Sequence, residues 1–83
     1  MSYKITLNNL GRNYEAKGAT ISEAITSFKL GKIVGRTILT VENGDGKKVE
    51  RIIAPLIAKR AFNGAGMMRE VAIKNLSLMF TGV

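Results

Sequence analysis

The chain of 83 residues contains no cysteine and no histidine. Without cysteine there is no disulfide framework, no thiolate nucleophile and no thiolate metal site. Without histidine, the commonest protein ligand for metals and the side chain that exchanges protons near neutral pH are also missing. The four serines therefore have no imidazole to activate them as nucleophiles. We predict a protein that is not an enzyme and that uses no cofactor and no metal, with no evident small-molecule substrate.

Long apolar runs and targeting signals are missing as well. The longest apolar stretch, Ile52 to Ala58, is too short to cross a bilayer. From Tyr3 onward the sequence alternates polar and apolar residues, which is not the pattern of a targeting leader. These features predict a soluble, cytoplasmic protein with no membrane partner.

Length and composition indicate one small globular domain, residues 1–83, with 46% apolar residues. A domain of this size buries only about 60% of the surface that its unfolded chain exposes. A partner that covers more apolar surface would therefore add stability, and oligomerisation is one alternative that the size supports.

One pattern, a β-hairpin followed by a short helix, occurs twice. The first copy, Tyr3 to about Gly31, has alternating segments at 3–7 and 13–17 around a turn at 8–11, followed by a helix at Ile21–Leu30. The second copy, Arg36 to about Asn63, has strands at 37–42 and 47–53 around the turn 43–46, and a helix at Pro55–Phe62. A third helix, Met67–Phe80, closes the chain. The order ββα-ββα-α predicts an α+β domain of two layers, a four-stranded antiparallel sheet with helices on one face.

Capping signals and apolar spacing predict how the helices begin and which sides they bury. Thr20 and Glu23 form a capping box at the first helix, and Gly31 suits its C-terminal cap. Pro55 suits the first turn of the second helix, whose predicted buried side is Leu56, Ile57, Ala61 and Phe62.

The third helix carries a broad apolar arc. The predicted stripe consists of Met68, Val71, Ala72, Leu76, Met79 and Phe80, with Arg69, Glu70, Lys74 and Ser77 turned mostly outward and Ile73 and Leu78 outside the stripe. Such an arc belongs either to a deeply packed core helix, the interpretation we favour, or to a helix that also contacts another subunit.

Motifs with specific chemistry are weak. The segment Gly64-Ala65-Gly66 resembles a dinucleotide loop but has Arg69 in place of the third glycine and follows a helix, which excludes that function. It is either an ordinary loop, which we favour, or a site for a single phosphate beside Arg69. The segment 43–46 lacks the remaining ligands of a calcium loop and is a turn. Glu42 and Glu50 are expected to face each other across the second hairpin as part of a solvated charge ladder.

Positive charge is the remaining signal. Thirteen Lys and Arg against six Asp and Glu give a net charge of +7, which favours nucleic acid, DNA or RNA, as a partner over a plain solvated surface. All five aromatic residues fall on predicted core faces, with Tyr14 the best exception, so contact with the phosphate backbone is favoured over base stacking. The predicted nucleic-acid-binding residues are Lys29, Lys32, Arg36, Lys47, Lys48, Arg51, Lys59 and Arg60.

The alternative function is assembly. The second hairpin carries apolar residues on both faces, which is typical of central strands or of a face that meets a partner. On this hypothesis the chain is a structural or adaptor subunit, for example of a phage particle or a nucleoprotein complex, or a homo-oligomer joined through hydrophobic faces. The residues predicted at that interface lie off the expected core faces and are Ile38, Ile52, Ile73 and Leu78.

Overall fold

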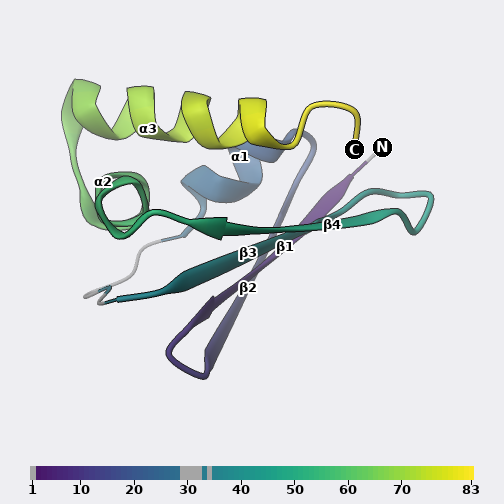
Figure 1. Ribbon diagram of the computed structural model, residues 1–83. Helices are drawn as coiled ribbons and strands as arrows, with labels where there is room; N and C mark the ends of the chain where they lie inside the picture. Colours follow the sequence, from purple (N-terminus) through teal and green to yellow (C-terminus); the bar gives the residue numbers. More distant parts are fainter. Residues whose placement is uncertain (1, 29–32, 34) are drawn as a thin grey trace.

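A computed structural model describes residues 2–28, 33 and 35–83 of the chain. Four strands form one layer and three helices form the other (Figure 1). In chain order the elements are β1 (Tyr3–Asn9), β2 (Arg12–Gly18), α1 (Ile21–Thr26), β3 (Thr37–Glu42), β4 (Lys48–Ile53), α2 (Pro55–Asn63) and α3 (Gly66–Met79). The predicted two-layer α+β fold and its ββα-ββα-α order are confirmed.

The sheet has the order β2-β1-β3-β4, and every neighbouring pair is antiparallel. Each hairpin pairs its own two strands, and the β1–β3 ladder joins the two copies of the repeat. In this register Leu7 lies opposite Leu39 and Ile5 lies opposite Val41. These four side chains are fully buried and form the centre of the face that the helices cover.

The two hairpin turns differ in chemistry. Leu10 and Gly11 join β1 to β2 with φ angles of 52° and 86°, so both turn residues are left-handed, as a type I′ turn requires. The turn between β3 and β4 is held by Asn43, whose side-chain oxygen accepts hydrogen bonds from Asp45 N at 2.9 Å and Lys47 N at 3.0 Å. An asparagine that bonds the backbone ahead of it stabilises a tight turn. This confirms the turn predicted at 43–46.

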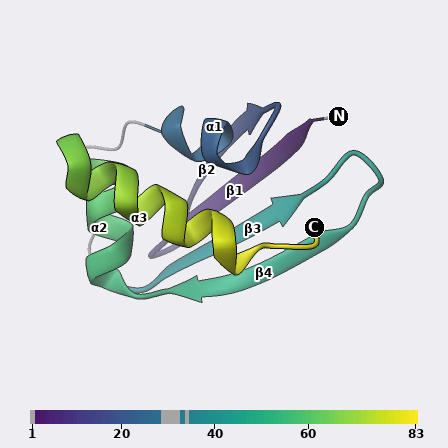
Figure 2. The ribbon, with the colours of Figure 1, turned by 90° about the horizontal axis from the view of Figure 1, so that it is seen from above.

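The helices pack on one face of the sheet. Seen from above, α1 lies over β1 and β2, α2 lies at the end of β4, and α3 begins over α2 and runs across the sheet beside α1 (Figure 2). At the junction of α1 and α2 the rings of Phe28 and Phe62 meet edge to face, with centroids 5.4 Å apart and an interplanar angle of 88°. Such a pair contributes about 0.5–1.5 kcal/mol beyond its buried area. The aromatic contact therefore ties the two copies of the repeat together.

Helix α1 begins as predicted and ends earlier. Its cap is Thr20, whose hydroxyl accepts from Glu23 N at 3.1 Å. The helix ends at Thr26 and not at Leu30, and Ser27 is its C-cap. The hydroxyls of Thr26 and Ser27 bond back to carbonyls one turn earlier, at 2.7 and 3.0 Å, a competition with the helix backbone that disfavours extension. The predicted cap at Gly31 lies outside the described residues.

Helix α2 buries most of its predicted side, with Leu56 as the exception. Ala58, Ala61 and Phe62 face the core, Ile57 is half-buried, and Leu56 is exposed. Because each helical residue advances about 100° around the axis, Leu56 points roughly opposite Ala58. The prediction that Leu56 is buried was therefore wrong.

Helix α3 is rotated relative to the predicted stripe. It buries Ala72, Ile73 and Leu76, while Met68, Val71 and Met79 are exposed. Ile73, predicted at an interface, is only 8% exposed and belongs to the core.

The cause of this rotation is that two polar residues expected to point outward face inward. Arg69 is half-buried and donates hydrogen bonds to carbonyls of α1 and α2. Ser77 is half-buried and lies 2.7 Å, oxygen to oxygen, from Ser22 of α1. Satisfying these groups turns the methionines and Val71 toward solvent.

Candidate nucleic-acid interface

Four exposed basic residues lie along one side of the domain, from the β1–β2 turn past the start of β3 to α2. We call Arg12, Arg36, Lys59 and Arg60 the basic end. Arg12 begins β2 opposite Asn9, and Asn9 also lies opposite Thr37, the residue after Arg36. Thr37 in turn pairs with Ile53, the last residue of β4, two residues before α2 begins. With strands about 4.8 Å apart, Arg12 and Arg36 are separated by two strand spacings, roughly 10 Å.

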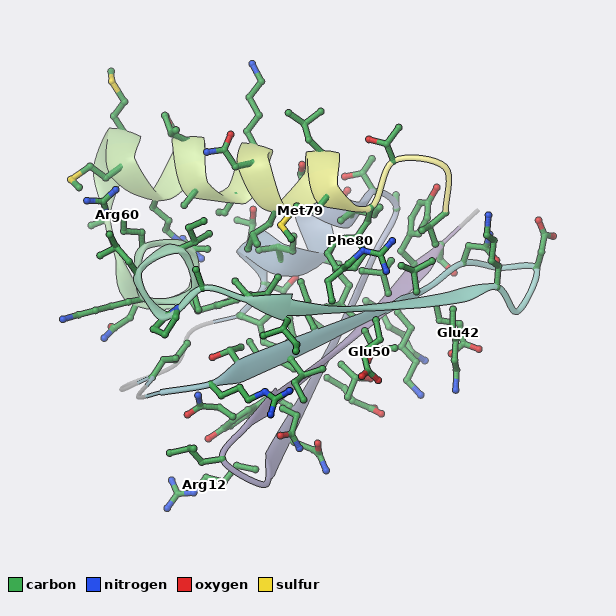
Figure 3. All side chains as sticks on the ribbon, in the orientation of Figure 1. Arg12, Glu42, Glu50, Arg60, Met79 and Phe80 are labelled. Atoms are coloured by element: carbon green, nitrogen blue, oxygen red, sulfur yellow. The ribbon has the colours of Figure 1, made fainter. Side chains whose placement is uncertain are left out.

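A buried side chain fixes the backbone in the middle of the basic end. Asn9 is 8% exposed, and its amide donates to Arg36 O at 3.3 Å and to Thr37 Oγ1 at 3.1 Å. On the other side, Lys59 and Arg60 lie between the buried residues Ala58 and Ala61, so the packing of α2 directs both cations to solvent. Figure 3 shows Arg12 at the tip of the first hairpin, at the bottom of this view, and Arg60 beside α2 in its upper part.

Among the described residues, no neighbouring side chain neutralises the charges of the basic end. Within the described ranges, 2–28, 33 and 35–83, all four side chains are exposed and none forms an ion pair or a side-chain hydrogen bond. No acidic residue is found in the described segments that build this end, 9–13, 35–37 and 52–63. Four solvated cations without a carboxylate produce a positive potential that attracts anions.

The structure separates the other predicted basic residues from this group. Lys47 and Lys48 lie at the far end of the β3–β4 hairpin, and the Lys47 ammonium donates to Gly82 O at 3.0 Å. Arg51 is on β4 opposite Leu39, and its guanidinium donates to Glu50 O at 3.0 Å. Lys29 and Lys32 lie outside the described residues. The eight predicted residues therefore do not form one continuous surface among those described.

The open face of the sheet, turned away from the helices, is balanced in charge. Three lysines and three glutamates occupy it, namely Lys4, Lys17, Lys48, Glu15, Glu42 and Glu50. Lys4 and Glu15 form an ion pair at 3.2 Å. Glu42 lies opposite Lys48, and Glu50 opposite Thr40, which corrects the expectation that the two glutamates face each other. Figure 3 shows both glutamates below the sheet, on the side away from the helices.

Aromatic platforms for bases are not found on the described surface. Phe28, Phe62 and Phe80 are at most 4% exposed. Tyr3 and Tyr14 pack partly buried against the core, and the Tyr3 hydroxyl donates to Val83 O at 3.2 Å. The prediction that aromatic residues serve the core is confirmed, which leaves phosphate contact as the chemistry that the basic end can perform.

Arg69 has a structural role, which contradicts the single-phosphate alternative for the loop at Gly64–Gly66. Its Nε donates to Ala61 O at 3.1 Å, and its Nη2 donates to Thr26 O at 3.0 Å and to Phe28 O at 3.1 Å. The guanidinium thus donates hydrogen bonds to the carboxyl-terminal ends of both α1 and α2, and these bonds fix its orientation.

Exposed apolar residues concentrate on the helices, where sequence reasoning missed most of them. Met67, Met68, Val71 and Leu78 of α3 are exposed, and Leu78 is the one of these that was predicted at an interface. The sequence does contain a signal for these exposed residues, because a second set of apolar residues at helical spacing lies on the side of α3 opposite Ile73.

The other predicted interface residues lie on the sheet. Ile38 and Ile52 face each other across β3 and β4 on the open face. Ile38 is half-buried and Ile52 is exposed. Together with the burial of Ile73, this means that the four predicted interface residues do not share one surface.

Two further features of the described residues bear on function. No helix among them has the length and hydropathy needed to cross a membrane. No group of three or more carboxylates, the remaining candidates for a metal site, comes together in this part of the chain.

Comparison with known proteins gives no relative: no protein-family model, no curated protein and no solved structure matches the chain.

Proposed function

We propose that this chain is a non-enzymatic binding module that contacts the phosphate backbone of nucleic acid through its basic end. The observation that carries the proposal is the row of exposed cations Arg12, Arg36, Lys59 and Arg60 along one side of the domain, with no carboxylate among the described residues of the segments that carry them. Lysine and arginine neutralise backbone phosphates without reading sequence. A cytoplasmic location, where such a partner is accessible, belongs to the same proposal.

The arrangement favours a duplex or a structured backbone over a splayed single strand. The cations come from three separate elements, the first hairpin, the residue before β3, and α2, and so span the end of the domain. The described surface offers no aromatic side chain for stacking bases. Recognition is therefore expected to depend on charge and shape, with little preference for sequence.

The test is a fluorescence-anisotropy titration of labelled duplex and single-stranded oligonucleotides at several salt concentrations. Each phosphate contact on duplex DNA changes the slope of log K against log salt by about −0.9, so a triple variant Arg12→Gln, Arg36→Gln, Lys59→Gln should reduce that slope by about 2.7. The three substitutions are on exposed residues that have no partner among the described residues, and a circular dichroism spectrum checks that the fold is kept.

A matched control separates a specific site from net charge alone. The variant Lys4→Gln, Lys17→Gln, Lys48→Gln removes the same number of charges from the open face of the sheet. It should bind almost as the natural chain does. Equal losses in both triple variants, or no binding at low salt by the natural chain, would overturn the basic end as a nucleic-acid site.

A second candidate function is that of a structural or adaptor subunit in a larger assembly. Exposed large apolar residues on α3 and at Ile52 favour it, because a partner that covers them would add burial to a small domain. Substitution of Ile52 or Leu78 by Asp should then prevent assembly, while the basic-end triple variant should leave assembly intact. The opposite pattern would exclude this candidate.

A further inference from the structure

Helix α3 carries a second apolar face in addition to the one it buries. Met67, Met68, Val71, Leu78 and Met79 are 78%, 57%, 53%, 62% and 40% exposed, and we call them the outer α3 face. At about 100° per residue these five positions lie within about one third of the helix circumference, centred roughly opposite the inward side. One helix thus presents an apolar side to the core and another to solvent.

The extent of this face is close to what a small protein interface needs. The accessible surface area of its exposed side chains is roughly 500 Å², which is at the upper end of the size of apolar patches on ordinary monomers. The weakest specific interfaces bury about 600 Å² per partner. The outer α3 face with the adjoining part of α2 reaches that range.

The face has a hollow at one end and protruding side chains at the other. A hollow of about 290 Å³ lies between α2 and the first half of α3, lined by Ile57, Met68, Val71 and Asn75 among others. Leu78 and Met79 lie ten residues beyond Met68, about 15 Å along the helix. An antiparallel partner copy would bring its own Leu78 and Met79 to the hollow of the first, and two-fold symmetry would repeat the contact.

The charged residues beside the face are complementary in the same orientation. Glu70 and Lys74 lie one turn apart on one flank of α3 and are exposed. When two α3 helices run antiparallel, this flank meets the same flank of the other copy, so Glu70 of each copy approaches Lys74 of the other. In a parallel pair this flank would instead face the opposite flank of the other copy, where Ala72 and Met79 lie, so the contact between Glu70 and Lys74 would not form.

We propose that two copies of this chain associate through antiparallel α3 helices, each placing Leu78 and Met79 in the α2–α3 hollow of the other. Arg60 of the basic end also lines this hollow, whereas Arg12, Arg36 and Lys59 do not, so the triple variant at those three residues leaves the proposed dimer interface unchanged. The interface is small, so association in the micromolar range is expected.

Sedimentation velocity on the natural chain, from about 1 µM to about 1 mM, tests the oligomeric state. A concentration-dependent shift from monomer to dimer is expected. Leu78→Lys should leave the chain monomeric throughout. Ile52→Lys is the matched control, since Ile52 is 58% exposed but lies on the open face of the sheet, and it should dimerise normally. A natural chain that stays monomeric, or a dimer lost in Ile52→Lys and kept in Leu78→Lys, overturns the proposal.

The orientation has its own test through the flanking charges. Glu70→Lys and Lys74→Glu should each weaken the dimer several-fold, and the double variant should recover most of the loss. If the double variant is weaker than either single variant, the antiparallel pairing of these residues is wrong.

Because the chain has no cysteine, a spin label at one introduced cysteine measures the geometry directly. Antiparallel helices place Asn75→Cys near the two-fold axis and Met67→Cys at the far end, so the label separation should be about 15 Å longer at 67 than at 75. Equal separations at the two positions would indicate parallel helices and overturn the proposal.

Discussion

Replacing Arg69 by methionine is expected to remove the main polar link between the three helices. Methionine keeps much of the length of the side chain and its packing but has no donors. The substitution deletes three hydrogen bonds of 3.0–3.1 Å, which run to carbonyl oxygens at Ala61, Thr26 and Phe28. These carbonyls belong to the ends of α1 and α2, so the guanidinium holds α3 against both helices.

The expected loss in the free energy of unfolding follows from the number and the burial of these hydrogen bonds. A hydrogen bond from a charged donor contributes about 1.5–3 kcal/mol when it is well sheltered. The bond to Thr26 O is exposed and the other two are partly buried, so water replaces some of the interaction and the total is about 2–4 kcal/mol. Domains of this length have a free energy of unfolding of about 4–12 kcal/mol. The variant should therefore lose a large fraction of its stability, with the Tm lowered by roughly 10–25 °C.

Thermal and urea unfolding followed by circular dichroism measure this loss. Arg12→Met is the matched control, since Arg12 is exposed and unbonded within the described part of the chain, and it should change the free energy of unfolding by less than about 0.5 kcal/mol. Arg69→Lys should fall between the two, because one ammonium cannot reach all three carbonyls in the guanidinium geometry. The reasoning is refuted if Arg69→Met unfolds at the same urea concentration as Arg12→Met.

Three further substitutions test local features of the fold by the same unfolding measurements. Leu10→Asn should stabilise the chain by up to about 1 kcal/mol, because φ at this position is 52° and Asn before Gly11 suits a type I′ turn; unchanged or lower stability would contradict this. Thr20→Ala should cost about 1 kcal/mol through loss of the α1 cap, and a loss under a few tenths would show that the cap contributes little. Ile73→Ala should cost about 2–4 kcal/mol and Leu78→Ala less than about 1 in the monomer, since the first is buried and the second exposed; similar losses would place α3 in a different rotation.

The fold was predictable because its signals are local. Alternation along Tyr3–Leu7, the turn at 43–46 and the pair Thr20 and Glu23 each determine a short segment, and the structure confirms all three. Because the hairpin-helix pattern occurs twice, the sequence also predicted a four-stranded sheet with helices on one face. The end of α1 was not predictable in the same way, since it depends on whether the hydroxyls of Thr26 and Ser27 bond back to the helix.

The rotation of α3 and the grouping of the cations depend on contacts between distant segments. Arg69 looks like a surface residue in the sequence, and its inward position follows only from carbonyls that α1 and α2 leave open. Likewise, Lys48 is nearer in sequence to Lys59 than Arg12 is, yet the register places Arg12 in the row that ends at Ile53, just before α2, and Lys48 at the other end of the sheet. Helical spacing alone cannot decide which of two apolar faces is buried when both are present.

The outer strands of the sheet have a consequence for aggregation. β2 and β4 are the two edges, and each leaves backbone groups that another strand could pair with. Three of the seven residues of β2 and three of the six of β4 are charged, and both signs occur on each edge. If a further strand paired with either edge, the charged side chains of β2 or β4 would lie next to the side chains of the added strand and would lose contact with water. The edges thus oppose open-ended growth into fibres by addition of strands.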